Sequence, residues 1–532
     1  MTQAATAASS PPRPTAAAAS SDGRLTGSKL GITLAAMCGA LMAILDISIV
    51  NVALSDIRAS FGTPLDQIAW VSTGYMMANI VIIPMTGWFQ RRFGFKRYFT
   101  FSVVLFTIAS ALCGLSWNLW SLVMFRVLQG MGGGAIIPTA QSILFARYPR
   151  EEHGMAGALF GLGAVTGPLL GPTVGGYLIN IASWHWIFLI NVPVGIAAAV
   201  LAWKHLDQPG YKAPKERIDK WGIVLLAVGM ATLQYVLEEG NREDWWESRT
   251  VCILAVIAAI ALVTFLVHEL ETEHPVVDLR VFKNRSYTGS TIINFLIGTT
   301  LFSSSYLFSL YCGAVMHYAA LDIGKLFLAA GIVQLFLMPM IGKFGSRFDP
   351  RKLMVFGIIT VSLSMWMTGH LTNQAGFWDL VRPRMLMSIG LGFLFVPLSM
   401  VALSDLPLAQ RGNATGLFNL TRELGGSIGT AFMSVALDRA TKTHALHLRE
   451  NITPYSQIAV EQLGAMKARF GSQVGDPLAA AYGALQGRVA VQALIRAFND
   501  GFLTVAVVFF ASLGLILLLK RPGMGIKIEG AH

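Results

Sequence analysis

The sequence predicts an all-α integral membrane protein with fourteen transmembrane helices, arranged as six, two and six. Three observations lead to this prediction. First, 54% of the 532 residues are hydrophobic and only 13% are charged, whereas about a quarter of a soluble domain is charged. Second, fourteen mostly apolar runs come close to the roughly 20 residues that a helix needs to cross a bilayer. Third, a charged loop between two of these runs occurs twice.

The chain begins and ends with polar segments. Residues 1–27 are rich in Ala, Ser, Thr and Pro and contain no apolar signal-peptide core, so we predict a disordered cytoplasmic tail. The fourteen runs occupy residues 30–52, 68–88, 98–115, 119–144, 156–181, 186–203, 221–237, 251–267, 290–311, 323–341, 353–371, 385–403, 414–437 and 502–519. We predict a polar periplasmic loop at 438–499 and a cytoplasmic tail at 521–532.

The repeated loop indicates an internal duplication. Residues 84–97 match residues 339–352 at an offset of 255, with Pro, Met, Gly, Phe, Arg and Phe in register. This offset joins the second run to the tenth, which fits two six-helix bundles at 28–204 and 286–520 separated by a two-helix hairpin at 205–285. Duplicated halves are typical of secondary transporters, whose substrate site lies between them. Chance similarity of one loop is the alternative.

The net charge of +11 does not indicate nucleic-acid binding, because the cations lie in alternate loops instead of on one surface. The first such loop contains Gly87, Arg91, Arg92, Gly94, Lys96 and Arg97. By contrast, the loops at 116–118 and 182–185 contain no Lys or Arg. The positive-inside rule therefore predicts that both termini are cytoplasmic.

Ion gradients are the predicted energy source. The chain contains no G-x-x-x-x-G-K-[ST] phosphate-binding loop. Its four cysteines form no CxxC pair, so we predict no metal site and no cofactor. Coupling to protons then requires a titratable group inside the membrane.

Asp46 is the first candidate for that group. It lies well inside the first apolar run, where an ionised carboxylate costs about 2.5–3.5 kcal/mol on insertion scales. It should therefore face a cavity. A purely structural hydrogen bond near the outer interface is the alternative interpretation.

Arg126 is a second buried charge, followed by Gln129 and several glycines in the fourth run. Its guanidinium needs an acceptor. Asp46, water in a cavity or backbone carbonyls are the three possibilities that the sequence leaves open.

The fifth run combines glycines and prolines. Its candidate hinge residues are Gly163, Gly167, Pro168, Gly171, Pro172, Gly175 and Gly176. Glycines every four residues give one smooth helix face, and tight packing alone would explain them. Two prolines four residues apart additionally favour a kinked helix at a moving interface.

Arg422 and Glu423 introduce two charges into the thirteenth run. Adjacent helical residues point about 100° apart, so we expect one to face the cavity and the other a neighbouring helix rather than a mutual pair. Glu423 is a further candidate for proton coupling. The polar residues proposed for the substrate cavity are Asn51, Tyr75, Asn79, Gln129, Asn419 and Arg422.

Together these motifs resemble the major facilitator superfamily. The resemblance rests on Leu45 and Asp46 with residues 49–54, the Gly87 loop, Arg126 with Gln129 and Gly130, and the glycine-proline pattern from Gly167 to Gly176. With fourteen spans, the chain is similar to the EmrB-type branch of proton-coupled drug antiporters, including in residues 245–285.

The resemblance implies a major facilitator fold and export of hydrophobic compounds in exchange for protons across the bacterial inner membrane. It also implies a periplasmic adaptor protein and an outer-membrane channel as partners. Asp46 would carry the proton, Arg126 would be its partner, and Gly167 to Gly176 would form the antiporter hinge. The chain departs from the family at Arg91, where an acidic residue is usual.

Two other functions remain open at this stage. A carrier of one metabolite would use the same fold but would need a more polar cavity. An intramembrane enzyme or lipid scramblase is a different class, and catalysis would require several titratable groups close together.

Overall fold

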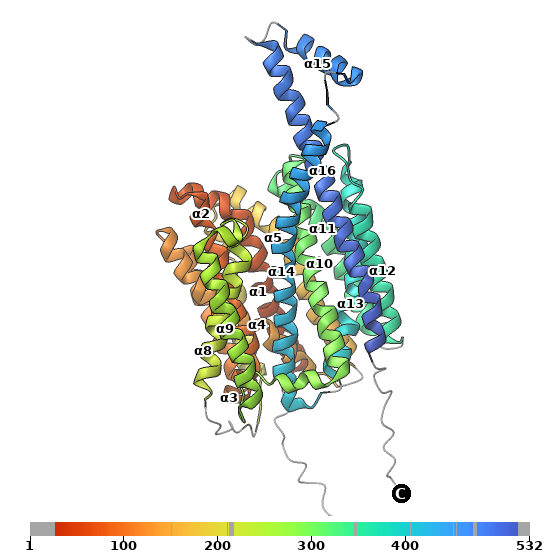
Figure 1. The fold of residues 1–532 in the computed structure, drawn as a ribbon. Helices are drawn as coiled ribbons and strands as arrows, with labels where there is room; N and C mark the ends of the chain where they lie inside the picture. Colours follow the sequence, from red (N-terminus) through yellow and green to blue (C-terminus); the bar gives the residue numbers. More distant parts are fainter. Residues whose placement is uncertain are drawn as a thin grey trace, which may run out of the picture.

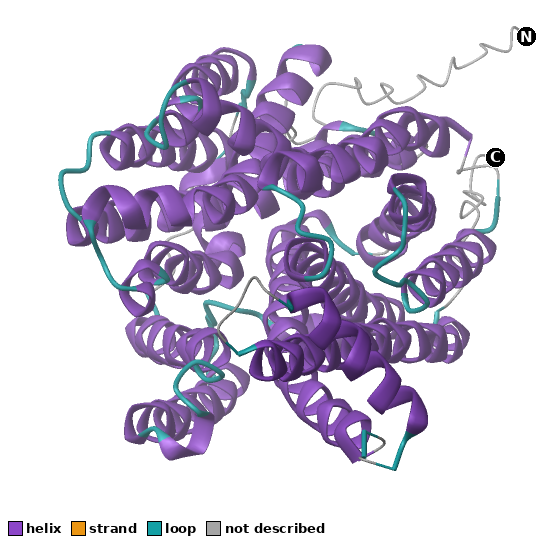
Figure 2. Ribbon diagram, turned by 90° about the horizontal axis from the view of Figure 1, so that it is seen from above, coloured by secondary structure: helices purple, strands orange, loops and turns teal. Residues whose placement is uncertain are grey.

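The computed structural model describes residues 27–519, except for 150–151, 210, 212–217, 345–347, 405, 451, 454 and 472–475. The predicted tails at 1–27 and 521–532 therefore lie outside the described residues, apart from residue 27. The described chain forms a bundle of upright helices, and no β-strand occurs in it (Figures 1 and 2). This confirms the predicted all-α class.

The first half of the bundle contains seven helices and ends before the hairpin. They are α1 (Lys29–Phe61), α2 (Leu65–Ile68), α3 (Trp70–Gly114), α4 (Leu119–Arg147), α5 (His153–Ile181), α6 (Trp186–Leu189) and α7 (Asn191–His205). Local signals fix several of their ends. For example, Asn118 and Ser121 form a capping box at the start of α4, and Gly62 ends α1 in the left-handed conformation.

The hairpin and the second half follow in sequence. The hairpin consists of α8 (Lys220–Glu239) and α9 (Arg249–Glu271), with the short helix η2 (Trp245–Glu247) between them. After η3 (Leu279–Lys283), the second half comprises α10 (Arg285–Ala314), α11 (Ala320–Phe344), α12 (Pro350–Thr368), α13 (Phe377–Ser404), α14 (Leu408–Glu450), α15 (Gln457–Phe470), α16 (Pro477–Ala511) and η5 (Ser512–Leu518).

Helix α3 has 45 residues and contains two predicted spans that are separated by a kink. The break between them is Gly94, whose backbone has φ 77° and ψ 160°. A residue with a side chain rarely adopts this conformation, so Gly94 lets the chain reverse between the two spans. Ten helices of the described part are long and apolar enough to cross a bilayer, and the exact number of fourteen stays a prediction.

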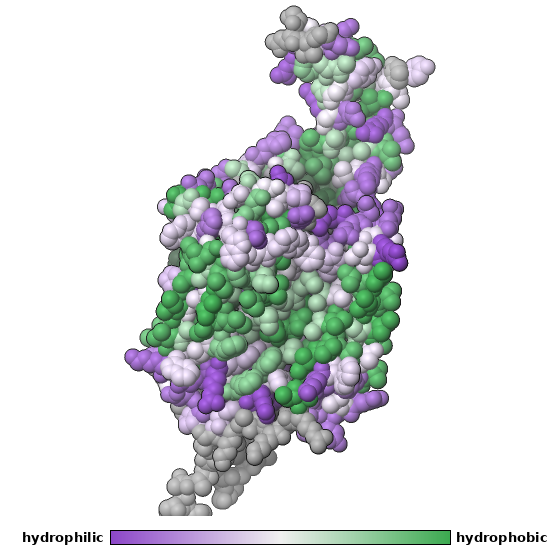
Figure 3. Space-filling view, turned by 90° about the vertical axis from the view of Figure 1, so that its left-hand side faces the viewer, coloured by the Kyte–Doolittle hydropathy of each residue, from purple (hydrophilic) through white to green (hydrophobic). Residues whose placement is uncertain are grey.

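The outer surface of the bundle matches a bilayer. In Figure 3 an apolar band crosses the middle of the visible face, and hydrophilic residues gather above and below this band. Large apolar side chains such as Phe101, Ile108 and Ile260 are more than half exposed in the absence of lipid. A soluble monomer rarely exposes so continuous an apolar surface, and the structure therefore supports a multi-pass membrane protein.

Residues 438–499 differ from the predicted polar loop, because most of them are helical. Helix α14 continues to Glu450, α15 follows, and α16 begins at Pro477, so that α15 and the start of α16 project beyond the rest of the bundle (Figure 1). Extending an existing helix needs no new nucleation, which favours helical structure in the ends of α14 and α16, and α15 packs against α16.

Candidate functional site

Asp46 and Arg126 form a buried ion pair in the first half of the bundle. Asp46 comes from α1 and Arg126 from α4, and the Arg126 Nη1 to Asp46 Oδ2 distance is 2.5 Å. Both side chains are at most 2% exposed. Of the acceptors that the sequence left open for Arg126, the structure therefore provides Asp46, together with the carbonyl oxygen of Val71 at 3.0 Å.

Neutral hydrogen-bond donors satisfy the second carboxylate oxygen of Asp46. Gln129 Nε2 donates to Oδ1 at 2.8 Å, and Asn191 Nδ2 donates to the same atom at 2.9 Å. Both amides also reach the hydroxyl of Ser110 at 3.1 Å. Because α1, α3, α4 and α7 all contribute, moving any of these helices disturbs the surroundings of the Asp46 carboxylate.

The glycines after Arg126 bring α3 and α4 close enough to cover the guanidinium. A Cβ atom on Gly130 would collide with the backbone of Tyr75, and one on Gly134 would collide with that of Asn79. This close approach puts the Tyr75 ring 4.1 Å from the Arg126 guanidinium carbon. The cation–π contact adds to the ion pair in holding Arg126 in place.

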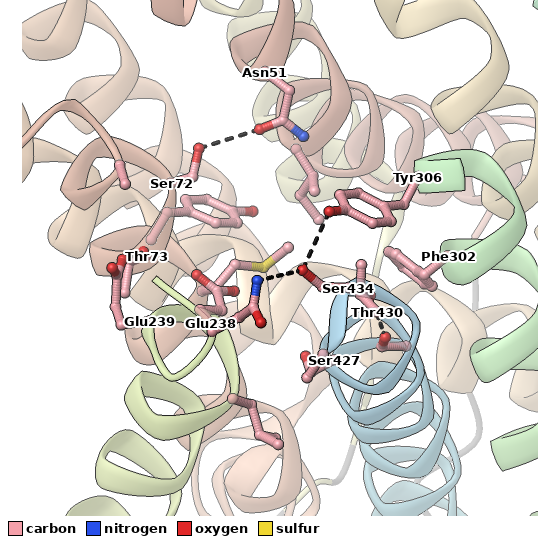
Figure 4. Close-up of a pocket in the computed structure, with 18 of the residues that line it drawn as sticks. Asn51, Ser72, Thr73, Glu238, Glu239, Phe302, Tyr306, Ser427, Thr430 and Ser434 are labelled. Atoms are coloured by element: carbon pink, nitrogen blue, oxygen red, sulfur yellow. Dashed lines mark hydrogen bonds between the residues drawn. The ribbon is translucent and has the colours of Figure 1, made fainter. Parts of the chain in front are cut away.

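A cavity of about 500 Å³ lies next to this pair. Its walls come from α1, α3 and α4 of the first half, from α10 and α14 of the second half, and from the end of α8 in the hairpin (Figure 4). Sites for small molecules usually measure about 300–1,000 Å³ and lie at interfaces between structural units. The size and position of the cavity suit a substrate site.

Arg126 and Tyr75 separate Asp46 from this cavity. Both residues line the cavity, whereas Asp46 does not and is fully buried behind them. A molecule in the cavity would therefore contact Arg126 directly and influence Asp46 through it.

The structure places only some of the predicted cavity residues in the cavity lining. Asn51 and Tyr75 line the cavity, as does Glu423, which we predicted for proton coupling. The others lie outside its lining: Asn79 donates to the Tyr75 hydroxyl at 3.4 Å, and Asn419 donates to Gln141 at 2.6 Å. Gln129 belongs to the Asp46 network, and Arg422 contacts other partners.

Arg422 and Glu423 point to different surroundings, as we expected, but they also form an ion pair, which we did not expect. Glu423 faces the cavity, while Arg422 donates to Asn419 at 2.9 Å and lies 5.8 Å from the Phe395 ring of α13. Their charged groups nevertheless approach to 3.8 Å, which is longer than a hydrogen bond.

The glycine face of α5 packs against α1. Cβ atoms on Gly167, Gly171 and Gly175 would collide with Ile44, Ser48 and Ile49, respectively. Gly176 instead faces Leu321 of α11, and Gly163 has an open environment close to Leu41. Pro172 is half-buried on the same helix, and the Pro168 side chain lies outside the described residues. Packing against α1 thus accounts for the three central glycines, while a hinge role stays a prediction.

The loop around Gly94 is held by the segment after α7. Lys96 forms an ion pair with Asp207 at 2.7 Å, and Gln208 accepts from the backbone N–H of Phe95 at 3.2 Å. The Tyr211 hydroxyl donates to the carbonyl oxygen of Arg91. The Arg91 backbone therefore anchors this loop. The nearby Arg92 and Arg97 are partly and largely exposed, respectively.

The two halves are in tight contact at the end of the bundle that we predicted to be cytoplasmic. Gly87 of α3 lies directly against the backbone of Gly412 and Asn413 on α14. Arg411 donates to the carbonyl oxygen of Phe145 at 3.4 Å, again between the halves. At the opposite end, Asn51 and Asn241 of the cavity are exposed. The structure is therefore closed at the first end, and the cavity reaches the surface at the other.

Sequence analysis missed two groups of residues at this site. Asn191 and Ser110 complete the hydrogen-bond network of Asp46. Each is a polar residue inside a predicted apolar run, which was the signal that the sequence offered. Glu238 and Glu239 line the cavity from the hairpin, although they lie just after the predicted run 221–237. The signal that the sequence offered for these two residues was an acidic pair at the end of a predicted span.

Residues 36–430 match the family described as the Major Facilitator Superfamily. The multidrug export protein EmrB of Haemophilus influenzae is 34% identical over 93% of this chain and 96% of its own. The colistin resistance protein EmrB of Acinetobacter baumannii and the fatty acid resistance protein FarB of Neisseria gonorrhoeae are each 32% identical, over 92% of this chain and 96% of theirs.

Two solved structures share the fold at low sequence identity. The human organic anion transporter MFSD10 has a TM-score of 0.58 at 11% identity, with 92% of this chain and 99% of that chain covered. The proton:xylose symporter XylE has a TM-score of 0.55 at 13% identity, with 91% and 95% covered.

A helical membrane bundle whose two halves enclose a cavity, next to a buried acid, defines a secondary transporter. The match over most of the chain specifies which kind: the protein belongs to the Major Facilitator Superfamily, as its motifs indicated.

Proposed function

We propose that this protein exports hydrophobic compounds across the bacterial inner membrane in exchange for protons. The observation that carries the proposal is the Asp46–Arg126 pair, which lies buried directly behind the wall of the central cavity. The similarity to multidrug export proteins over more than nine-tenths of the chain supports the same function.

In the proposed mechanism, Asp46 exchanges its proton and Arg126 transmits the change. When Asp46 is ionised, the ion pair holds the Arg126 guanidinium in its present position. Protonation removes the negative charge, so the ion pair weakens and Arg126 becomes available to the cavity. Rocking of the two halves would then expose the cavity to alternate sides of the membrane, as duplicated transporters do.

The proton gradient is the only energy source in this proposal, and no cofactor takes part. We further propose cytoplasmic termini, and a periplasmic adaptor and outer-membrane channel that continue the export path. The projecting α15 and the start of α16 lie at the end that this orientation makes periplasmic.

Transport of one amphipathic metabolite is the second candidate, because several hydroxyl and amide side chains line the cavity. Ser72, Asn241, Ser427, Thr430 and Ser434 line it together with aromatic residues. A wide panel of compounds separates the two functions, since a carrier for one metabolite would move few of them.

The proposal is tested in proteoliposomes under an imposed pH gradient. Efflux of a fluorescent lipophilic compound is measured for the native protein and for Asp46→Asn, inserted at equal levels. We expect gradient-driven efflux to be lost in the variant while substrate binding remains. An unaltered rate in Asp46→Asn would assign a structural role to Asp46, and a native protein that ignores the gradient would refute proton exchange.

A further inference from the structure

The inserted hairpin forms part of the cavity wall. Glu238 and Glu239 at the end of α8, with Asn241 and Arg242 after it, face the space between the halves. Figure 4 shows Glu239 beside Thr73 and Glu238 on the side that faces Ser434. The hairpin is thus in a position to contact the same molecule as the two halves.

Hydrogen bonds hold the end of α8 against both halves. Thr73 of α3 donates to Glu239 at 3.0 Å. From the hairpin, Gln234 donates to Ser427 at 3.0 Å, and Asn241 donates to Ser434 at 2.8 Å, both on α14. These contacts fix the position of the acidic pair relative to the cavity.

The charges around the cavity leave one carboxylate without a counter-charge. Glu239 is paired with Arg242 at 2.5 Å, and Glu423 lies 3.8 Å from Arg422. The other cation of the wall, Arg126, is paired with Asp46. Within the described part of the chain, Glu238 forms no ion pair, and its carboxylate accepts hydrogen bonds from Gln234 at 2.7 Å and from Thr73.

The surroundings of Glu238 suit an organic cation. The aromatic rings of Tyr75, Phe302 and Tyr306 line the same cavity, and aromatic faces attract cations. Gln234, which is 1% exposed, orients Glu238, and its own carbonyl oxygen accepts no hydrogen bond from the described residues. A hydrophobic cation bound here would neutralise the Glu238 carboxylate and contact the aromatic rings.

We propose that Glu238, supplied by the inserted hairpin, determines specificity by binding the positively charged group of cationic substrates. This inference rests on the proposed function, because it takes the cavity as the substrate site. It assigns the hairpin a direct part in substrate recognition in addition to its place in the membrane.

The test measures equilibrium binding of radiolabelled tetraphenylphosphonium to the purified full-length protein. We expect Glu238→Gln to weaken binding at least about tenfold, since a lost contact with a charged group is worth about 1.5–3 kcal/mol. Glu238→Asp, which keeps the charge, should retain most of the affinity. Glu247→Gln is the matched control, because it removes an exposed charge at the same end of the hairpin but outside the cavity lining.

Equal affinity of the native protein and Glu238→Gln for the cation would overturn the inference, as would the absence of binding to the native protein. If Glu238→Gln does not fold, Glu238→Asn and Glu238→Asp give the same comparison of neutral and charged side chains. Gradient-driven efflux of neutral compounds is also measured, with the same purified protein in proteoliposomes. This measurement tests the proposed export function separately from the role of Glu238. Such efflux would uphold the proposed function even when the role of Glu238 fails.

Discussion

Asp46 and Arg126 depend on each other, because neither charge has another ionic partner in the described structure. Gln129 and Asn191 supply hydrogen bonds to the carboxylate but no charge. Removing one partner of a buried pair leaves the other charge uncompensated in a medium of low dielectric constant. The pair should therefore behave as one unit in stability measurements.

A double-mutant cycle tests this coupling. We expect Arg126→Met to lower the free energy of unfolding by about 3–5 kcal/mol, because it leaves the Asp46 carboxylate buried without a cation. Asp46→Asn combined with Arg126→Met should be clearly more stable than Arg126→Met alone. Unfolding of the detergent-solubilised protein measures both effects. Additive losses in the two single variants would show that the two side chains do not interact.

At the scale of single elements, the glycines of α5 determine how closely this helix approaches α1. Gly171 lies against Ser48, whose hydroxyl donates to the carbonyl oxygen of Gly167 at 3.2 Å. Since α1 carries Asp46 two residues before Ser48, the spacing between α1 and α5 also affects the ion pair.

Filling this contact should therefore disturb both stability and transport. We expect Gly171→Val to lower the free energy of unfolding by about 1–3 kcal/mol, as overpacking of a tight interface does. Gly487→Val in α16 is the control, because a Cβ atom there would meet no neighbour within 4 Å. Thermal unfolding and proteoliposome efflux are the measurements. Equal effects of the two substitutions would contradict close α1–α5 packing as the cause.

At the scale of the whole molecule, the duplicated halves keep similar architecture but differ in charge. Arg384 of α13 can be compared with Arg126 of α4, since α13 and α4 contain the fourth predicted spans of their halves, and Arg384 directly precedes its span. Arg384 donates to the carbonyl oxygen of Ser304 on α10 at 2.7 Å and stacks 3.8 Å from the Phe308 ring. Arg126 contacts Gln129 three residues later, whereas Arg384 contacts Met387 three residues later, at 3.5 Å. The second half thus retains the buried cation, with Ser304 at the place of the acid.

This asymmetry leads to a prediction for the second half. Arg384 is 2% exposed and has no acidic partner in the described part of the chain. We expect Ser304→Asp to raise the free energy of unfolding by about 1.5–3 kcal/mol relative to Ser304→Asn, the usual range for a hydrogen bond to a charged group. Chemical unfolding in detergent makes the comparison. A less stable Ser304→Asp would mean that burying the new carboxylate outweighs its attraction to Arg384.

The overall arrangement also explains which parts of the site the sequence could predict. Asp46 and Arg126 were identifiable because an ionisable residue inside an apolar run is costly and needs a reason to be there. Glu238 carried no such signal, since charges at the end of a span lie near water in most helices. Its place in the cavity depends on the packing of α8 between α3 and α14. The helices within 438–499 were missed because this segment is polar and its helical periodicity is weak.

The sequence by itself determined the membrane class, the family and the two buried charges Asp46 and Arg126, because these follow from hydrophobic run length, ordered motifs and the cost of burying charge. Only the tertiary structure decided which acceptor Arg126 uses, which polar residues face the cavity and that the hairpin joins its wall. Those features depend on the rotation of each helix and on contacts between distant segments, such as Asn191 with Asp46. Local sequence patterns specify which helices form, whereas packing between helices specifies which side chains meet.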